Sequence, residues 1–158
     1  MLKIYLTCIR PDLEYAVQVW SPYQKGHLNA LESVQKFALK VCFKQWSLDY
    51  QSLLRTYGIQ TLEKRRQYLN LCFLYNVLSG VYTFPEPSSI KFKPVSNHFT
   101  RSHKCQLLIP KARTLSHLNS FFCAISRVWN LLPESVVSAN NIEQFKRRLS
   151  AHMSNLWY

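Results

Sequence analysis

The side chains of this sequence that could form a binding site are mainly its cations. Lysine and arginine number 20 against 8 aspartates and glutamates, which gives a formal net charge of +12. An excess of this size favours a polyanionic partner, and nucleic acid is the usual one. The alternative is a basic surface that keeps the chain soluble and has no specific partner. Three groups of cations along the chain are candidates for contacts with such a partner.

The first group is a ridge of lysines, Lys36, Lys40 and Lys44, which recur at every fourth residue. This spacing places them on one side of a helix expected over residues 26–44. Like charges so placed repel each other by roughly 0.2–0.5 kcal/mol per pair, and phosphate contacts would offset this cost. The alternative is an ordinary solvated face. The opposite side of the same stretch carries an apolar stripe of Leu28, Leu31, Val34, Ala38, Val41 and Cys42.

The second group, Lys64, Arg65 and Arg66, lies near the start of a helix expected over residues 61–78. Cations at this end oppose the positive pole of the helix dipole. Either acids elsewhere in the chain offset them, or an anionic ligand does so.

The third group lies between Pro87 and Pro133, a stretch that contains seven cations and no acid. Phe92, Phe99 and His103 are interleaved with these cations. Aromatic rings beside cations are typical of surfaces that bind single-stranded nucleic acid, since bases stack and phosphates pair with positive charge. The alternative is a flexible basic loop. The seven cations are Lys91, Lys93, Arg101, Lys104, Lys111, Arg113 and Arg127.

No metal, cofactor or nucleophile motif is apparent. The five histidines and cysteines over residues 98–123 are separated by 4, 1, 11 and 5 residues, which fits no usual zinc pattern. The three glycines are isolated and form no phosphate-binding loop. Five cysteines make no disulfide framework, and Cys42, Cys72 and Cys123 are expected to be small buried apolar residues. The candidate metal ligands considered are His98, His103, Cys105, His117 and Cys123.

The elements that position these side chains are expected to be mainly helical. Apolar periodicity predicts helices over 11–20, 48–57 and 115–132, besides the two already named, and a last helix capped by Asn140. The first of them is expected to bury Trp20. A short β-hairpin is expected from residues 90–93 and 105–109. We predict a helical region over 1–82, a proline- and serine-rich basic linker over 83–103 and a helical region over 104–158.

The order of several short motifs along the chain is similar to that in one protein family. The sequence resembles the segment that follows the palm in reverse transcriptases of non-LTR (LINE-type) retrotransposons, of the jockey and chicken-repeat kind. The likeness rests on Arg10-Pro11, Leu13-Glu14-Tyr15-Ala16, Val19-Trp20-Ser21-Pro22, Leu31-Glu32-Ser33-Val34-Gln35-Lys36, Tyr57-Gly58-Ile59, Thr100-Arg101-Ser102-His103, Val128-Trp129-Asn130-Leu131-Leu132-Pro133-Glu134 and Phe145-Lys146-Arg147-Arg148-Leu149.

This resemblance implies a helical thumb that grips template–primer duplex by its backbone, and a C-terminal region that helps to hold element RNA. Met1 would then lie just beyond the palm of a longer polymerase. Such enzymes need palm carboxylates that hold two metal ions. The only aspartates here are Asp12 and Asp49, and no Tyr-x-Asp-Asp sequence occurs. We therefore expect a non-catalytic fragment of an RNA-directed DNA polymerase, whose backbone contacts are the cations of these three groups apart from Arg127.

The expected partners are RNA or an RNA/DNA duplex, together with the missing palm or another protein. A helical protein-interaction module is the alternative function, since Leu2, Ile4, Leu6 and Ile9 would be exposed without a palm. A retrotransposon relic without a selected function is a further alternative. No apolar run is long enough to span a bilayer, and no membrane partner is expected. The expected compartment is intracellular and reducing, either nucleus or cytoplasm.

Overall fold

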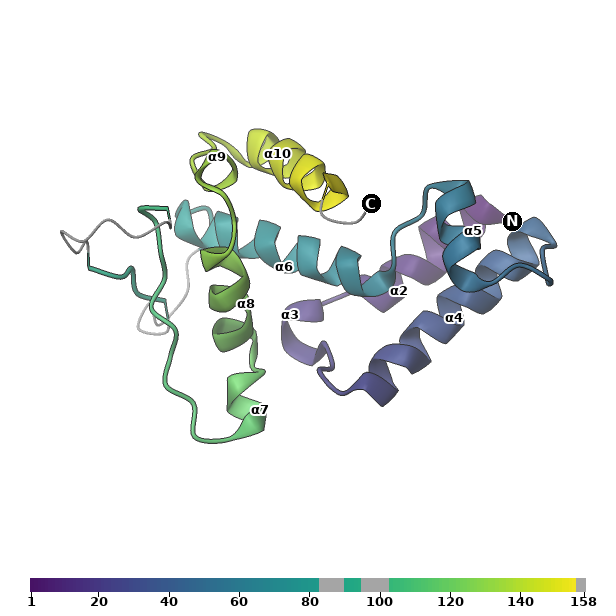
Figure 1. The fold of residues 1–158 in the computed structure, drawn as a ribbon, viewed down its shortest axis with the longest axis horizontal. Coiled ribbons are helices and arrows are strands. Elements are labelled where there is room, and N and C mark those ends of the chain that lie inside the picture. The colour runs from purple at the N-terminus through teal and green to yellow at the C-terminus, as the bar shows by residue number, and fades with distance from the viewer. Residues whose placement is uncertain (83–89, 95–102, 156–158) are drawn as a thin grey trace. The chain divides into compact units, whose positions relative to one another are not determined.

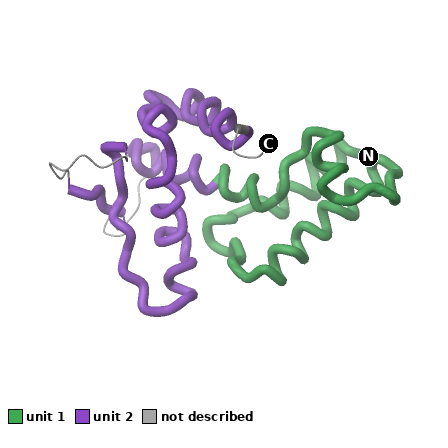
Figure 2. Tube along the Cα trace, in the orientation of Figure 1, with its two compact units in different colours: residues 1–69 green, residues 70–158 purple. Residues whose placement is uncertain are grey.

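The computed structural model describes residues 1–82, 90–94 and 103–155, and these are mainly helical, as the sequence predicted (Figure 1). The expected hairpin is reduced, in this part of the chain, to one antiparallel bridge between Phe92 and Leu107. The chain divides into two compact units, Met1–Leu69 and Asn70–Tyr158 (Figure 2). The division falls inside a helix, α6 (Leu62–Leu78), whereas the sequence suggested a boundary beyond it.

The first unit begins with a continuous helical run. It consists of α1 (Leu2–Ile4), a π-helical segment η1 (Tyr5–Ile9) and α2 (Arg10–Glu14). The Arg10 N–H donates to the Tyr5 carbonyl, five residues back, just before Pro11. A proline ring clashes with the carbonyl of the preceding helical turn, and the wider π turn relieves that clash.

The expected helix over 11–20 is broken in the middle, which corrects the prediction of one helix with a buried tryptophan face. Tyr15 is extended and Ala16 is left-handed with φ 48°, before α3 (Val17–Trp20) begins. Val17 enters the core, whereas Trp20 is 39% exposed. The Trp20 Nε1–H donates to the Tyr15 carbonyl at 2.5 Å, a bond that a continuous helix would not leave available.

Three further helices follow the predicted boundaries closely. They are α4 (Lys25–Phe43), α5 (Tyr50–Tyr57) and α6 (Leu62–Leu78). The Asp49 carboxylate accepts from the N–H groups of Gln51 and Ser52 and so caps α5, and Gly58 with φ 62° ends it. Thr61 Oγ1 accepts from Lys64 N–H at 3.2 Å and caps α6, as predicted.

A polar network runs through the first unit, buried at Tyr5 and Gln35 and half-buried at Glu32 and Tyr50. Tyr5 Oη donates to Gln35 Oε1 at 2.5 Å, and Gln35 Nε2 donates to Tyr50 Oη at 2.8 Å. Tyr50 Oη donates in turn to Glu32 Oε2 at 2.5 Å, while Glu32 Oε1 accepts from Glu63 N–H at 2.8 Å. Burial raises the pKa of Tyr5 to about 12. Burial and the hydrogen bond to Glu32 raise the pKa of Tyr50 as well. The network joins η1, α4, α5 and the start of α6.

In the second unit the expected helix over 115–132 is also broken, into α7 (Leu115–Leu118) and α8 (Phe121–Asn130). Asn119 Nδ2 donates to the Leu115 carbonyl at 2.8 Å, and Ser120 Oγ donates to the His117 carbonyl at 2.7 Å. These side chains compete with the backbone for its carbonyls and so end the helix. Leu115 is therefore largely exposed, contrary to the continuous apolar seam that we predicted.

The chain then forms a short helix that the sequence did not indicate, α9 (Glu134–Val137), and the expected last helix, α10 (Ile142–Asn155). The cap of α10 is displaced by one residue from the predicted Asn140, because Asn141 Oδ1 accepts from Gln144 N–H at 2.8 Å. Gln144 Oε1 accepts from Asn140 N–H at 2.8 Å, which completes a reciprocal arrangement close to a capping box.

An aromatic core holds the second unit together. Phe145 stacks on Tyr75 and Trp129, with ring centroids 4.4 and 5.9 Å apart. All five cysteines are free, and Cys72 and Cys123 are buried as predicted, whereas Cys42 is half-buried. Among the described helices, none combines the length and the apolar content that crossing a membrane requires.

Candidate nucleic-acid interface

The predicted lysine ridge lies along the C-terminal half of α4. Lys36 and Lys44 are exposed and Lys40 is half-buried. Lys44 ends the helix in a left-handed conformation with φ 55°. Cations at this end are stabilised by the helix dipole, which lowers the cost of gathering them. Lys40 Nζ donates to the backbone carbonyl of Trp46 at 2.9 Å, and this bond holds the loop after α4 against the ridge.

Two exposed aromatic residues that the sequence prediction missed accompany the lysines. Phe37 is 63% exposed and Trp46 is 58% exposed, and their rings pack edge to face with centroids 6.2 Å apart. The missed signal was the position of Phe37 outside the apolar stripe of α4, beside Lys36 and three residues before Lys40. We call Lys36, Phe37, Lys40, Lys44 and Trp46 the α4 patch. Cations beside exposed aromatic rings can pair with phosphates and stack on bases.

The second predicted group does not form a comparable surface. The Arg65 guanidinium makes a two-point ion pair with Glu14, through Nε to Oε1 and through Nη2 to Oε2, the latter at 2.8 Å. This hydrogen bond raises the pKa of Arg65. An internal acid therefore offsets Arg65, which was one of the two alternatives. Lys64 is half-buried.

Arg66 lies in the interior and not on the surface that the prediction required. It is 2% exposed, and neither Nη1 nor Nη2 has a hydrogen-bond partner among the described residues. Burial lowers the pKa of Arg66, although Glu32 and Glu63 act in the opposite direction. A guanidinium in this position does not reach a phosphate outside the unit.

Most cations of the third group are exposed in the second unit. Arg101 and Phe99 lie outside the described residues. His103, expected at the surface, is buried, and its Nε2 lies 3.1 Å from the Trp129 carbonyl. Arg127 is turned inward, since its Nη2 donates to the Leu118 carbonyl at 2.8 Å. The exposed cations of the predicted set here are Lys91, Lys93, Lys104, Lys111 and Arg113.

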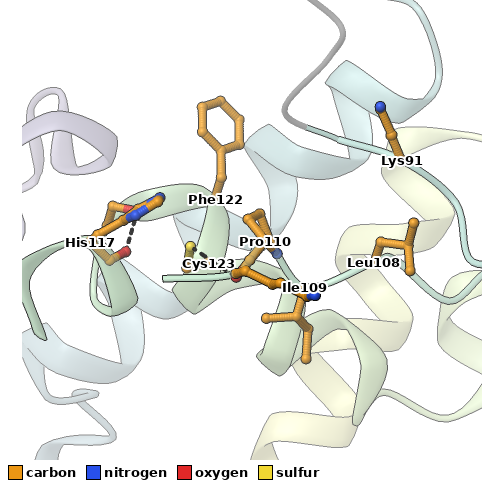
Figure 3. Close-up of a pocket in the computed structure, with 9 residues that line it drawn as sticks. Lys91, Leu108, Ile109, Pro110, His117, Phe122 and Cys123 are labelled. Carbon is orange, nitrogen blue, oxygen red and sulfur yellow. Dashed lines mark hydrogen bonds between the residues drawn. The ribbon is translucent and has the colours of Figure 1, made fainter. Parts of the chain in front are cut away.

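Lys91 and Lys111 line one pocket of about 400 Å³, which we call the lysine pocket (Figure 3). Apolar residues of the segment before α7 contribute to its lining, and Cys123 Sγ donates to the Pro110 carbonyl at 3.8 Å. Among the described residues, no acid lines the pocket. Figure 3 shows the Phe122 ring and the Lys91 amine extending toward the same side of the view. The remaining lining residues are Leu108, Ile109, Pro110, His117, Ser120, Phe122 and Cys123.

The candidate metal ligands do not assemble into a donor set in the described ranges. No group of three histidine, cysteine, aspartate or glutamate side chains there could hold a metal ion. His117 and Cys123 both line the lysine pocket, whereas His103 is buried against Trp129. His98 lies outside the described residues.

Comparison with known proteins identifies no family. No protein-family profile matches the chain, and no solved structure matches it. The chain is similar to "Uncharacterized protein B0403.1" of Caenorhabditis elegans, with 27% identity over 92 residues. The similarity covers 56% of this chain and 46% of the worm protein, so the chain spans about half the length of that relative.

Proposed function

We propose that this chain binds the sugar–phosphate backbone of nucleic acid, as a non-catalytic part of a LINE-type reverse transcriptase. The α4 patch would contact the backbone of RNA or an RNA/DNA duplex. The exposed lysines of the second unit would add further phosphate contacts. The cations buried or paired inside the first unit, Arg65 and Arg66, take no part.

The α4 patch is the observation that carries this proposal. Lys36 and Lys44 are eight residues apart, which corresponds to about 12 Å along a helix. Because of this separation, the two amines can contact different phosphates. The exposed rings of Phe37 and Trp46 beside them suit stacking on an unpaired or terminal base. The net charge of +12 supports the same partner class.

The motif order along the chain supports the more specific assignment to a reverse transcriptase. The matched motifs are structural positions, and none supplies a carboxylate pair for two-metal phosphoryl transfer. The proposed role is therefore to hold nucleic acid for chemistry that takes place elsewhere.

Binding titrated against salt tests the proposal. The full chain would be titrated with a labelled RNA/DNA duplex at increasing salt concentration. Counterion release predicts that log K falls linearly with log salt, with about 0.9 in slope for each duplex phosphate neutralised. A slope of several units supports backbone binding. Absent binding, or binding that salt does not weaken, contradicts it.

A protein-interaction module is the second candidate, and one observation favours it. Ile4 and Ile9 are exposed on the first helical run, whereas Leu2 and Leu6 pack against the core of the first unit. Half of the predicted apolar surface is therefore available to a partner. Salt-insensitive binding to a protein partner, without nucleic-acid binding, would favour this function.

A further inference from the structure

We propose that the lysine pocket binds one unpaired nucleotide, with its phosphate between Lys91 and Lys111 and its base against Phe122. The ligand class is a nucleoside phosphate, either free or as one residue of a single strand. For a nucleotide within a single strand, the inference rests on the proposed function. It assigns to the pocket a ligand that the α4 patch does not bind in that proposal.

The size of the pocket suits one nucleotide. Its volume is about 400 Å³. Sites for small ligands usually have volumes of about 300–1,000 Å³, and they combine an apolar lining with a few placed polar groups. Leu108, Ile109 and Pro110 supply the apolar surface here. The sugar could lie over this surface, while the base stacks on Phe122 and the phosphate remains near the lysines.

The charge of the pocket selects an anion. Lys91 and Lys111 both line it, and none of its described lining residues carries a carboxylate. Ser120, which precedes α8, donates its hydroxyl to the His117 carbonyl and does not cap the helix. The positive pole of the α8 dipole, at the pocket wall, adds to the field of the two lysines.

An aromatic chain supports the wall on which the base would stack. Phe122 packs edge to face against Phe121 with ring centroids 5.2 Å apart. Phe121 packs in the same way against Phe73 of α6, at 5.6 Å. Phe122 is therefore part of a packed aromatic cluster. A rigid aromatic surface loses little conformational entropy when a base stacks on it.

The backbone of Lys91 is held by hydrogen bonds to the segment that precedes α7. The Lys91 carbonyl accepts from Leu108 N–H at 2.8 Å. Leu107, the neighbour of Leu108, is fixed to α8 because the Asn130 side chain accepts from its N–H at 2.8 Å and donates to its carbonyl at 2.9 Å. Lys91 and α8 are thus joined through one strand-like segment, and the pocket exists before any ligand arrives.

The experiment uses the full chain with three probes: adenosine 5′-monophosphate, a single-stranded oligoadenylate and a blunt RNA/DNA duplex. Two pocket variants are compared, Phe122→Leu and the double variant Lys91→Gln with Lys111→Gln. The matched control is Lys3→Gln with Lys25→Gln, which removes two exposed charges outside the pocket lining and outside the proposed phosphate contacts. Thermal unfolding of each variant verifies the fold, and the lysine variants keep the test valid if Phe122→Leu fails to fold.

We expect Phe122→Leu to weaken binding of the oligoadenylate about tenfold, the size of effect expected for the loss of one stacked base. The double lysine variant should reduce the salt slope for the single strand by about 0.7, the value for one lost phosphate contact. Duplex binding should change little in either pocket variant. If the pocket holds free nucleotide as well, the monophosphate binds saturably and both variants weaken it.

The inference is overturned if the pocket variants bind both the oligoadenylate and the monophosphate as the unmodified chain does. Should duplex still bind in that case, the pocket assignment fails and the proposed function stands. The opposite outcome is that the unmodified chain binds neither the duplex nor the single strand. It would bind the monophosphate saturably, and this binding would depend on Phe122. The proposed function then fails, and the pocket is a site for free nucleotide.

Discussion

Glu14 on α2 and Arg65 on α6 form a two-point ion pair, with Arg65 Nη2 2.8 Å from Glu14 Oε2. The pair joins residues 51 positions apart and ties the first helical run to α6. Arg10 Nε also lies within 3.8 Å of Glu14. Glu14 thus pairs with Arg65, a cation that the sequence had suggested for nucleic-acid contact.

Replacing Glu14 by glutamine should destabilise the protein by about 2 kcal/mol, because a largely buried guanidinium loses its charged acceptor. Urea denaturation measures the change in the free energy of unfolding. Glu143→Gln is the matched control, since its carboxylate is 79% exposed and pairs with Lys146 at the surface. Such surface pairs contribute about 0–1 kcal/mol. Equal losses in the two variants would contradict a structural role for the Glu14–Arg65 pair.

Arg66→Met should leave the protein as stable as before or more stable by about 1 kcal/mol or more. Burial is the largest influence on the pKa of Arg66 and lowers it, so the folded protein disfavours the charged form. An apolar side chain of similar length removes that cost. Urea denaturation again provides the measurement, and nucleic-acid affinity should not fall. A marked loss of stability would mean that the Arg66 charge is paired in solution.

Stability should fall at alkaline pH because of Tyr5 and Tyr50. An unfolded tyrosine has a pKa of about 10, whereas burial raises the pKa of Tyr5 to about 12. The unfolded chain therefore releases these protons first, and the contribution of Tyr5 is complete below about pH 10 and is lost as the pH rises through about 12.

Free energies of unfolding from about pH 8 to about pH 12 would measure this loss. Tyr5→Phe should cost about 1 kcal/mol at neutral pH, through the lost bond to Gln35, and should flatten the alkaline slope. Tyr15→Phe is the control, because Tyr15 is exposed. A slope that Tyr5→Phe leaves unchanged would exclude Tyr5 as its source.

Asn141→Ala should destabilise α10 by about 1 kcal/mol, the usual effect of a lost N-cap side chain. Asn140→Ala should have a much smaller effect, since only its backbone N–H takes part in the cap. Thermal unfolding of the two variants distinguishes them. A larger loss of stability for Asn140→Ala than for Asn141→Ala would contradict this, and would favour Asn140 as the cap, as the sequence alone suggested.

The sequence predicted α4, α5 and α6 well because their signals are local. Asp49 and Thr61 cap helices, Gly58 ends one, and apolar periodicity fills the spans between them. It did not predict the breaks near Ala16 and Ser120. There, side-chain bonds to backbone carbonyls compete with the helix, and periodicity carries no information about that competition.

The candidate sites were also predictable only in part. The spacing of Lys36, Lys40 and Lys44 was sufficient to place them on one ridge. The inward position of Arg65 was not predictable, because Glu14 is its neighbour only in the folded chain. Lys91 and Lys111 likewise line one pocket because the bridge between Phe92 and Leu107 brings their segments together.

The most direct test of the central claim is the salt dependence of duplex binding by a variant that lacks the outer charges of the α4 patch. Lys36→Gln is combined with Lys44→Asn, since asparagine tolerates the left-handed conformation at that position. Lys3→Gln with Lys25→Gln removes two exposed charges of the same unit outside the patch. The patch variant should reduce the slope of log K against log salt by about 1.8, which corresponds to two phosphates, while the control keeps the original slope. Equal slopes in the two double variants would contradict the assignment of the α4 patch as the backbone contact.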